Sequence, residues 1–124
     1  MIKISDREAY PFILEKMKDK CLLAGSLEDD IKSFMSHDKH ECYFADDYSC
    51  FICVSYLDNF VFIPYTWRDN SRTSLKKLVK FAKSLYTRYT INKDIPILYS
   101  GLKNFYPNHS VEIADSIWKL IIRG

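Results

Sequence analysis

A strand followed at once by a polar loop and a helix, from Asn59 to Tyr89, is the feature that most restricts how this sequence can fold. Its first part, Phe60–Thr66, is a run of β-branched and aromatic residues, which is typical of a buried strand. Its last part predicts an amphipathic helix, because apolar residues recur at helical spacing: Leu75, Leu78, Val79, Ala82, Leu85, Tyr86 and Tyr89. We expect the apolar side of this helix to face a core and its lysines to face solvent.

The loop between the strand and the helix predicts an anion site. A helix start offers unpaired backbone N–H groups and the positive end of the helix dipole, both of which attract anions. Ser71, Thr73 and Ser74 are each suitable as the N-cap, and Arg68 and Arg72 add positive charge. The simpler alternative is that the two arginines are only solvated loop residues.

The rest of the chain predicts an α/β (α+β) fold in the order β-α-α-β-β-β-α-β-(α)-β. Asp6 is a suitable N-cap for the first helix, and the bracketed helix is a short piece at Leu102–Tyr106. Short turns between the three central strands predict an antiparallel meander. A right-handed crossover then makes Phe60–Thr66 and Ile95–Tyr99 parallel neighbours. Ser110–Ile122 is either one bent strand or a hairpin.

These elements together predict a mixed, mostly antiparallel sheet of about five to seven strands with flanking helices. The 124 residues are expected to form a single domain, residues 1–124. No apolar run approaches the length of a membrane span, and the first residues lack a signal-peptide pattern. We therefore expect a cytoplasmic protein with no membrane contact and with its cysteines reduced.

Histidines and cysteines between residues 37 and 53 raise the question of a zinc site. Cys50 and Cys53 lie in a predicted strand, where residues three apart point to opposite faces, so they cannot share a metal. A zinc knuckle also needs a tight turn, which this segment lacks. We predict that both cysteines are core residues and that the protein has no metal site.

Charge is distributed unevenly along the chain. Residues 1–60 carry a net charge of −5 and residues 61–124 carry +7. After Arg72, the helix within residues 71–89 has five more basic residues and no acidic one: Lys76, Lys77, Lys80, Lys83 and Arg88. Such a surface is usually just solvated, and contact with nucleic acid is the alternative. No nucleic-acid-binding motif accompanies it, so this partner is the least expected.

The predicted order of elements resembles the GNAT superfamily of acyl-CoA-dependent N-acyltransferases, and the resemblance covers nearly the whole chain. In that family the fourth strand leads into a loop that binds the pyrophosphate of coenzyme A. The fourth and fifth strands splay apart to admit the pantetheine arm. The resemblance therefore implies acetyl-CoA as cofactor, held at its pyrophosphate by residues of the predicted anion site: Arg68, Ser71, Arg72, Thr73 and Ser74.

Phe105-Tyr106 resembles a Phe-Tyr pair of the family whose tyrosine can protonate the leaving thiolate, so Tyr106 is the implied catalytic residue. The sequence departs from the family at the pyrophosphate loop, which usually reads Arg/Gln-x-x-Gly-x-Gly/Ala. Here that loop has arginines but no glycine. Small, divergent members with such degenerate loops are carried by phages and include internal virion proteins. The resemblance to them implies a location in the host cytoplasm or in the virion.

Three functions follow as alternatives. The first is an N-acetyltransferase that moves an acetyl group from acetyl-CoA to a small-molecule or protein amine. The second is a non-catalytic protein on the same scaffold that binds a protein partner, in a virion or in a host cell. Nine tyrosines fit this alternative, because tyrosine is enriched at protein interfaces. The third is a nucleic-acid binder that uses the basic helix.

Overall fold

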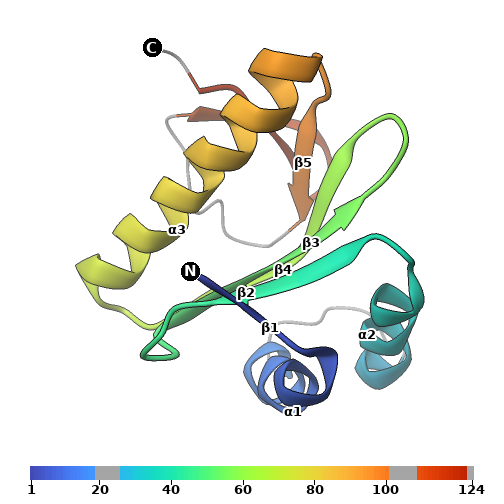
Figure 1. Ribbon diagram of the computed structural model, residues 1–124, viewed down its shortest axis with the longest axis vertical. Helices are drawn as coiled ribbons and strands as arrows, with labels where there is room; N and C mark the ends of the chain where they lie inside the picture. Colours follow the sequence, from blue (N-terminus) through green and yellow to red (C-terminus); the bar gives the residue numbers. More distant parts are fainter. Residues whose placement is uncertain (19–25, 101–108, 123–124) are drawn as a thin grey trace.

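The computed structural model describes residues 1–18, 26–100 and 109–122, which form a seven-stranded sheet with α-helices on both faces (Figure 1). In chain order the elements are β1 (Ile2–Ile4), α1 (Asp6–Met17), α2 (Leu27–Ser36), β2 (His40–Phe44), β3 (Cys50–Tyr56), β4 (Val61–Arg68), α3 (Arg72–Leu85), the π-helix η1 (Tyr86–Ile91), β5 (Ile97–Ser100), β6 (Ser110–Ala114) and β7 (Ile117–Leu120). The fold is mixed α+β with a mostly antiparallel sheet, as predicted. The helical piece predicted at Leu102–Tyr106 lies outside the described residues.

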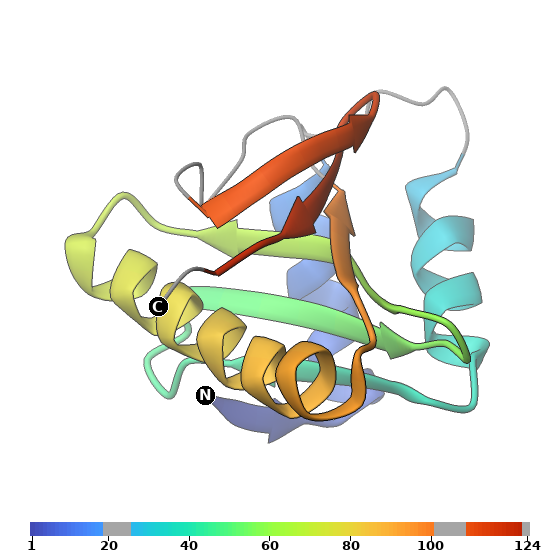
Figure 2. The same ribbon diagram turned by 90° about the horizontal axis from the view of Figure 1, so that it is seen from above.

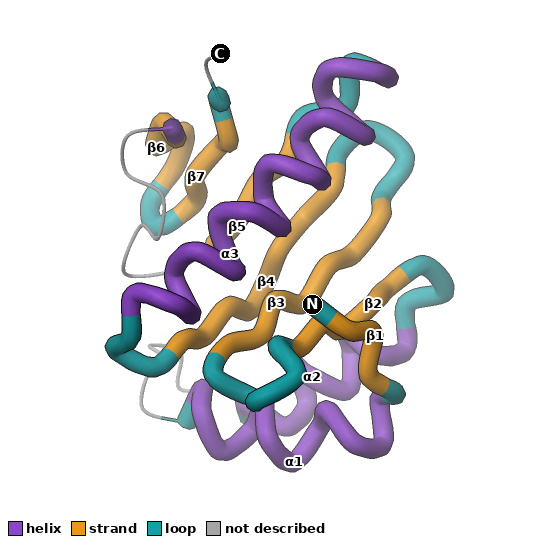
Figure 3. Tube along the Cα trace, turned by 60° about the vertical axis from the view of Figure 1, so that its left-hand side comes forward, coloured by secondary structure: helices purple, strands orange, loops and turns teal. Residues whose placement is uncertain are grey.

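The strands lie in the order β1-β2-β3-β4-β5-β7-β6, and Figure 3 shows β5 beside β4 with the β6–β7 pair beyond it. Neighbouring strands are antiparallel except β4 and β5, which run parallel in a register that starts with Val61 opposite Ile97. This confirms the predicted parallel pairing across the crossover helix. Of the two alternatives for the C-terminal segment, the hairpin is correct, because β6 and β7 pair around Asp115 and Ser116.

Two hydrophobic cores lie on opposite faces of the sheet. Helices α1 and α2 cover one face and α3 covers the other (Figures 1 and 2). Cys50 belongs to the core under α3, together with Ile52, Val54 and Leu78. Cys53 belongs to the core under α1 and α2. The prediction that these two cysteines are core residues on opposite faces is therefore confirmed.

Helix α3 packs on the sheet through its apolar stripe. Leu78, Ala82 and Leu85 are buried, whereas Leu75 and Val79 are half-buried at the edges of the stripe. Three of the four lysines of α3 are exposed, as predicted. Lys77 is the exception, because its ammonium lies 3.6 Å from Asp46 and 3.4 Å from Asp47, both in the turn between β2 and β3.

The N-cap of the first helix lies one residue earlier than predicted. Ser5, not Asp6, is the N-cap of α1, because its backbone is extended and its hydroxyl accepts a hydrogen bond from the Glu8 N–H (3.4 Å). Asp6 is instead the first helical residue, where its carboxylate still interacts favourably with the helix dipole. The Asp6 side chain is thereby directed to a different partner, His40.

Candidate functional site

The connection from β4 to α3 is a loop closed by its own side chains. Ser71 is the N-cap of α3, and its hydroxyl accepts a hydrogen bond from the Ser74 N–H (3.1 Å). Ser74 is fully buried, and its hydroxyl donates to the carbonyl oxygens of Asp69 (3.1 Å) and Ser71 (2.9 Å). Thr73, the third candidate cap, is exposed. Of the three predicted hydroxyls, two therefore shape the loop.

The two arginines of the loop differ in what they contact. Arg68 Nη1 donates to the carbonyl oxygens of Asp69 (3.1 Å) and Ser71 (3.4 Å), so its guanidinium braces the turn into the helix. Arg72 is the first residue of α3 and is exposed. Arg72 is therefore the better placed of the two to meet an anion at the helix start.

Asp69 is the residue of this loop that the sequence reasoning overlooked. One of its carboxylate oxygens accepts hydrogen bonds from both the backbone N–H (3.0 Å) and the hydroxyl (2.5 Å) of Ser71. These hydrogen bonds, first from the Ser71 side chain, lower the pKa of Asp69, so the group is negatively charged at neutral pH. The Asp-x-Ser spacing is typical of a turn in which an aspartate bonds the backbone two residues on, and it was the available signal.

The parallel pairing of β4 with β5 ends at a defined point. Between two successive β3–β4 pairs, β3 has one residue, Val54, where β4 has two, Ile63 and Pro64. This extra residue is a β-bulge, which bends a strand and disrupts pairing. The Pro64 carbonyl accepts a hydrogen bond from the Ser100 hydroxyl of β5 (3.0 Å). In a strand, the N–H and C=O of one residue point to the same side. The N–H that Pro64 lacks would therefore have faced β5, so the hydrogen bonding between β4 and β5 stops there.

Beyond Pro64 no described strand pairs with the β5 side of β4, which we call the open edge. β5 pairs with β4 only up to Ile63, and from Tyr65 to Arg68 the strand pairs, among the described strands, with β3 alone. Two residues after Pro64, Thr66 presents its backbone N–H and C=O on that open side. Open strand edges of this kind can hold an extended ligand by backbone hydrogen bonds. This edge runs directly into the loop before α3.

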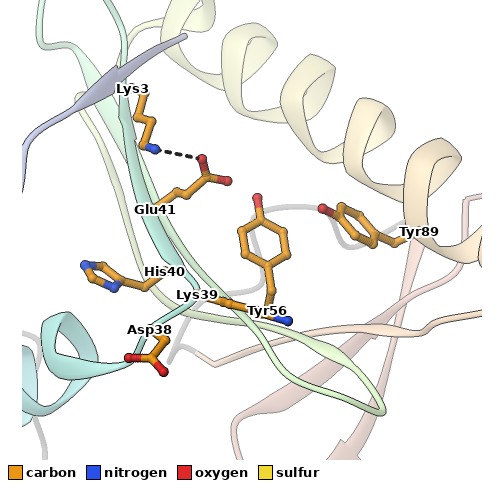
Figure 4. Close-up of a pocket in the computed structure, with 7 residues that line it drawn as sticks. All are labelled: Lys3, Asp38, Lys39, His40, Glu41, Tyr56 and Tyr89. Carbon is orange, nitrogen blue, oxygen red and sulfur yellow. Dashed lines mark ion pairs between the residues drawn. The ribbon is translucent and has the colours of Figure 1, made fainter.

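A second candidate site lies at the opposite end of β4, near η1. A cavity of about 460 Å³ is lined by residues of β1, of the start of β2 and the two positions before it, of the end of β3 and of η1 (Figure 4). Lys3 Nζ lies 3.3 Å from Glu41 Oε2 there. The rings of Tyr56 and Tyr89 pack with their centroids 5.3 Å apart. A π-helical turn carries Tyr89 to this position, and such turns are frequent at functional sites.

The electrostatics of this cavity centre on Glu41. Partial burial raises its pKa, but the neighbouring hydroxyls of Tyr56 and Tyr43 and the ammonium of Lys3 outweigh burial, and the pKa lies below its ordinary value. The Tyr56 hydroxyl points toward this carboxylate (Figure 4), yet its oxygen is buried without a hydrogen-bond partner among the described residues. Burial, and then the nearby carboxylate, raise the pKa of Tyr56. The interaction of Tyr56 with Glu41 is therefore electrostatic rather than a formed hydrogen bond.

His40 lines the same cavity, but both of its ring nitrogens already have partners. Nε2 lies 2.9 Å and 2.8 Å from the two carboxylate oxygens of Asp6, and Nδ1 contacts the carbonyl oxygen of His37. The sequence raised His37 and His40 as candidate zinc ligands, and the zinc site was rejected on spacing. In the described ranges, no group of three or more His, Cys, Asp or Glu side chains is arranged to hold a metal ion.

No protein-family model matches the sequence, and no curated protein matches it. None of the helices in residues 1–18, 26–100 and 109–122 has the length and apolar character needed to cross a membrane. The predicted catalytic Tyr106 lies outside the described residues. The five predicted cofactor-binding residues lie together at the start of α3, and the Glu41 cavity was not foreseen.

Proposed function

We propose that this protein is a GNAT-like N-acetyltransferase that transfers an acetyl group from acetyl-CoA to an amine. The observation that supports the proposal is the end of the β4–β5 pairing at Ile63 and Tyr99, beside the bulge at Ile63 and Pro64. In the GNAT superfamily, which the sequence resembles, the pantetheine arm enters between the fourth and fifth strands where they splay. Here the arm would lie along Tyr65–Arg68 and bond the backbone of Thr66.

The residues present fit coenzyme A at the strand edge and in part at the loop. At the loop, the Arg72 guanidinium offers a planar set of donors that suits a pyrophosphate. The N–H groups of Arg72 and Thr73 belong to the first turn, which helix geometry leaves without intrahelical acceptors. The carboxylate of Asp69 opposes an anion at the same place, because it is bonded to Ser71 beside the helix start.

Acetyl-CoA would supply the reactive thioester, and the protein would orient it and handle protons. Thr66 would fix the arm through its backbone, and Arg72 would hold the charged end. The family resemblance assigns protonation of the leaving thiolate to Tyr106. Among the described residues β4 carries no carboxylate or histidine, so the proton of the attacking amine would leave through water.

Asp69 favours a second candidate, a non-catalytic protein on the same scaffold that binds a protein partner. A fixed carboxylate beside the helix start weakens any phosphate bound there, since like charges repel. In this case the open β4 edge would serve as a docking strand for an extended segment of the partner. The two candidates differ in whether acetyl-CoA binds.

Calorimetric titration with acetyl-CoA separates the candidates. Arg72→Ala should weaken binding at least about tenfold, as expected for the loss of a charge-assisted hydrogen bond of about 1.5–3 kcal/mol. Asp69→Asn should tighten binding, because it removes the opposing charge while keeping an acceptor for Ser71. Arg88→Ala is the matched control, since Arg88 is also exposed but lies in η1.

Thiol release from acetyl-CoA in the presence of a panel of amines then tests catalysis. Release that depends on both protein and amine supports the enzyme. Binding that responds to Arg72 and Asp69 without thiol release supports a non-catalytic acyl-CoA binder. No heat with acetyl-CoA at millimolar concentration, in either wild-type or Asp69→Asn protein, rejects the proposal in favour of the second candidate.

A further inference from the structure

The cavity beside η1 has a built wall and an exposed rim. Its wall consists of Glu41 on β2, Tyr56 on β3 and Tyr89 on η1, which are held by the sheet and by the packing of the two tyrosine rings (Figure 4). Its rim carries Lys3 and Lys39, which are exposed. Among the charged groups of this cavity, the Glu41 carboxylate belongs to the wall, whereas Lys3 and Lys39 belong to the exposed rim.

The contact between Lys3 and Glu41 indicates which ligand chemistry this wall accepts. The Lys3 side chain is 64% exposed and reaches over from the edge strand β1, whereas Glu41 is 25% exposed. An ion pair in which the lysine is this exposed contributes little to stability. The carboxylate therefore already receives a primary ammonium, supplied by a side chain that can leave.

Tyr56 and Tyr89 complete a site for that group. The Tyr56 hydroxyl oxygen is buried without a hydrogen-bond partner among the described residues, although it faces Glu41 (Figure 4). An ammonium has three donors, so it can bond both the carboxylate and this oxygen. The tyrosine rings attract cations through their faces, and Lys93 Nζ already lies 5.3 Å from the centroid of the Tyr89 ring.

We propose that this cavity binds a primary ammonium group of a ligand, in the place that Lys3 takes, with Glu41 and Tyr56 as its partners. The ammonium can belong to a small alkylamine or to a lysine side chain of a peptide. The inference stands apart from the acetyl-CoA proposal, because the open edge and the loop before α3 lie at the other end of β4. Anion binding by Lys3 and Lys39 is the opposing interpretation, and Glu41 disfavours it.

The test is an amide-resolved NMR titration at constant ionic strength with n-butylammonium, with neutral 1-butanol as the matched control. We expect butylammonium, but not butanol, to shift the amides of Glu41, Tyr56 and Tyr89. Lys3→Ala should tighten binding at least about threefold, because it removes a competitor that occupies the site most of the time. Lys76→Ala changes the net charge equally on the exposed face of α3 and should leave the affinity unchanged.

Glu41→Gln should weaken binding at least about tenfold, in keeping with the loss of a charge-assisted bond, and Tyr56→Phe should weaken it less. If Glu41→Gln fails to fold, Lys3→Ala alone decides, since its substitution is at the rim. A blocked lysine tripeptide that binds more tightly than butylammonium assigns the site to a peptide, and the reverse order assigns it to a small amine. The proposal is overturned if neither probe binds wild-type or Lys3→Ala protein, or if Lys3→Ala weakens the binding of butylammonium.

Discussion

Replacement of Leu78 by alanine tests how the crossover helix is packed. Leu78 is 1% exposed and lies in the core under α3. Removing three carbons from a packed core position costs about 2–5 kcal/mol, with the larger values where the surroundings cannot collapse. Unfolding entropy near 2.1 cal/mol/K per residue gives about 0.26 kcal/mol/K for this chain, so Tm should fall by about 8–20 °C. Differential scanning calorimetry measures this directly.

Lys80→Ala on the same helix is the control for that measurement. Lys80 is exposed, and alanine has at least the helix propensity of lysine, so the free energy of unfolding should change by less than about 0.5 kcal/mol. Chemical denaturation should show the same ranking, with an unchanged slope for both variants. Equal losses from the two substitutions would mean that the buried face of α3 is wrongly assigned.

Two further predictions concern the loop before α3 and the turn between β2 and β3. Ser71→Ala should lower the free energy of unfolding by about 0.5–2 kcal/mol through loss of the N-cap, whereas Thr73→Ala should change it little. If urea denaturation gave the opposite order, Thr73 and not Ser71 would be the N-cap. The nearby Ser49 hydroxyl, the Ser49 backbone N–H, which donates to the Asp47 carboxylate (3.1 Å), and Lys77 hold the pKa of Asp47 at about 2 instead of 3.8. A depressed pKa contributes stability above the unfolded value near pH 4, and this contribution is lost as the pH falls toward 2. Asp47→Asn should therefore flatten stability between about pH 4 and pH 2, and an unchanged acid profile would show that the contact is unimportant.

The fold was largely predictable because its signals are local and repeated. The apolar spacing from Leu75 to Leu85 identified α3 and its buried side, and the crossover rule then required β4 and β5 to be parallel. The spacing of Cys50 and Cys53 placed them on opposite faces. Boundaries were less exact: Ser5 replaced Asp6 as a cap because both residue types fit, and only the backbone conformation decides between them.

The candidate sites were less predictable, because they depend on contacts between segments distant in sequence. Asp69 was passed over although it adjoins Arg68, since its effect depends on the turn that brings it to Ser71. A proline within a predicted strand indicated a bulge at Pro64, but the sequence could not show that the Pro64 backbone faces β5. The Glu41 cavity joins three strands and a π-helical turn, and no sequence pattern predicts that Tyr89 reaches Tyr56.

The most direct test of the proposed function is to observe where acetyl-CoA binds. In an amide-resolved NMR titration of the wild-type protein, the largest shifts should fall on Thr66, Arg68, Arg72 and Thr73, along the open edge of β4 and the start of α3. The Thr66 amide should also become protected from hydrogen exchange, because it gains a partner. No shifts at millimolar acetyl-CoA, or shifts confined to the cavity around Glu41, would contradict an acyl-CoA site between β4 and β5.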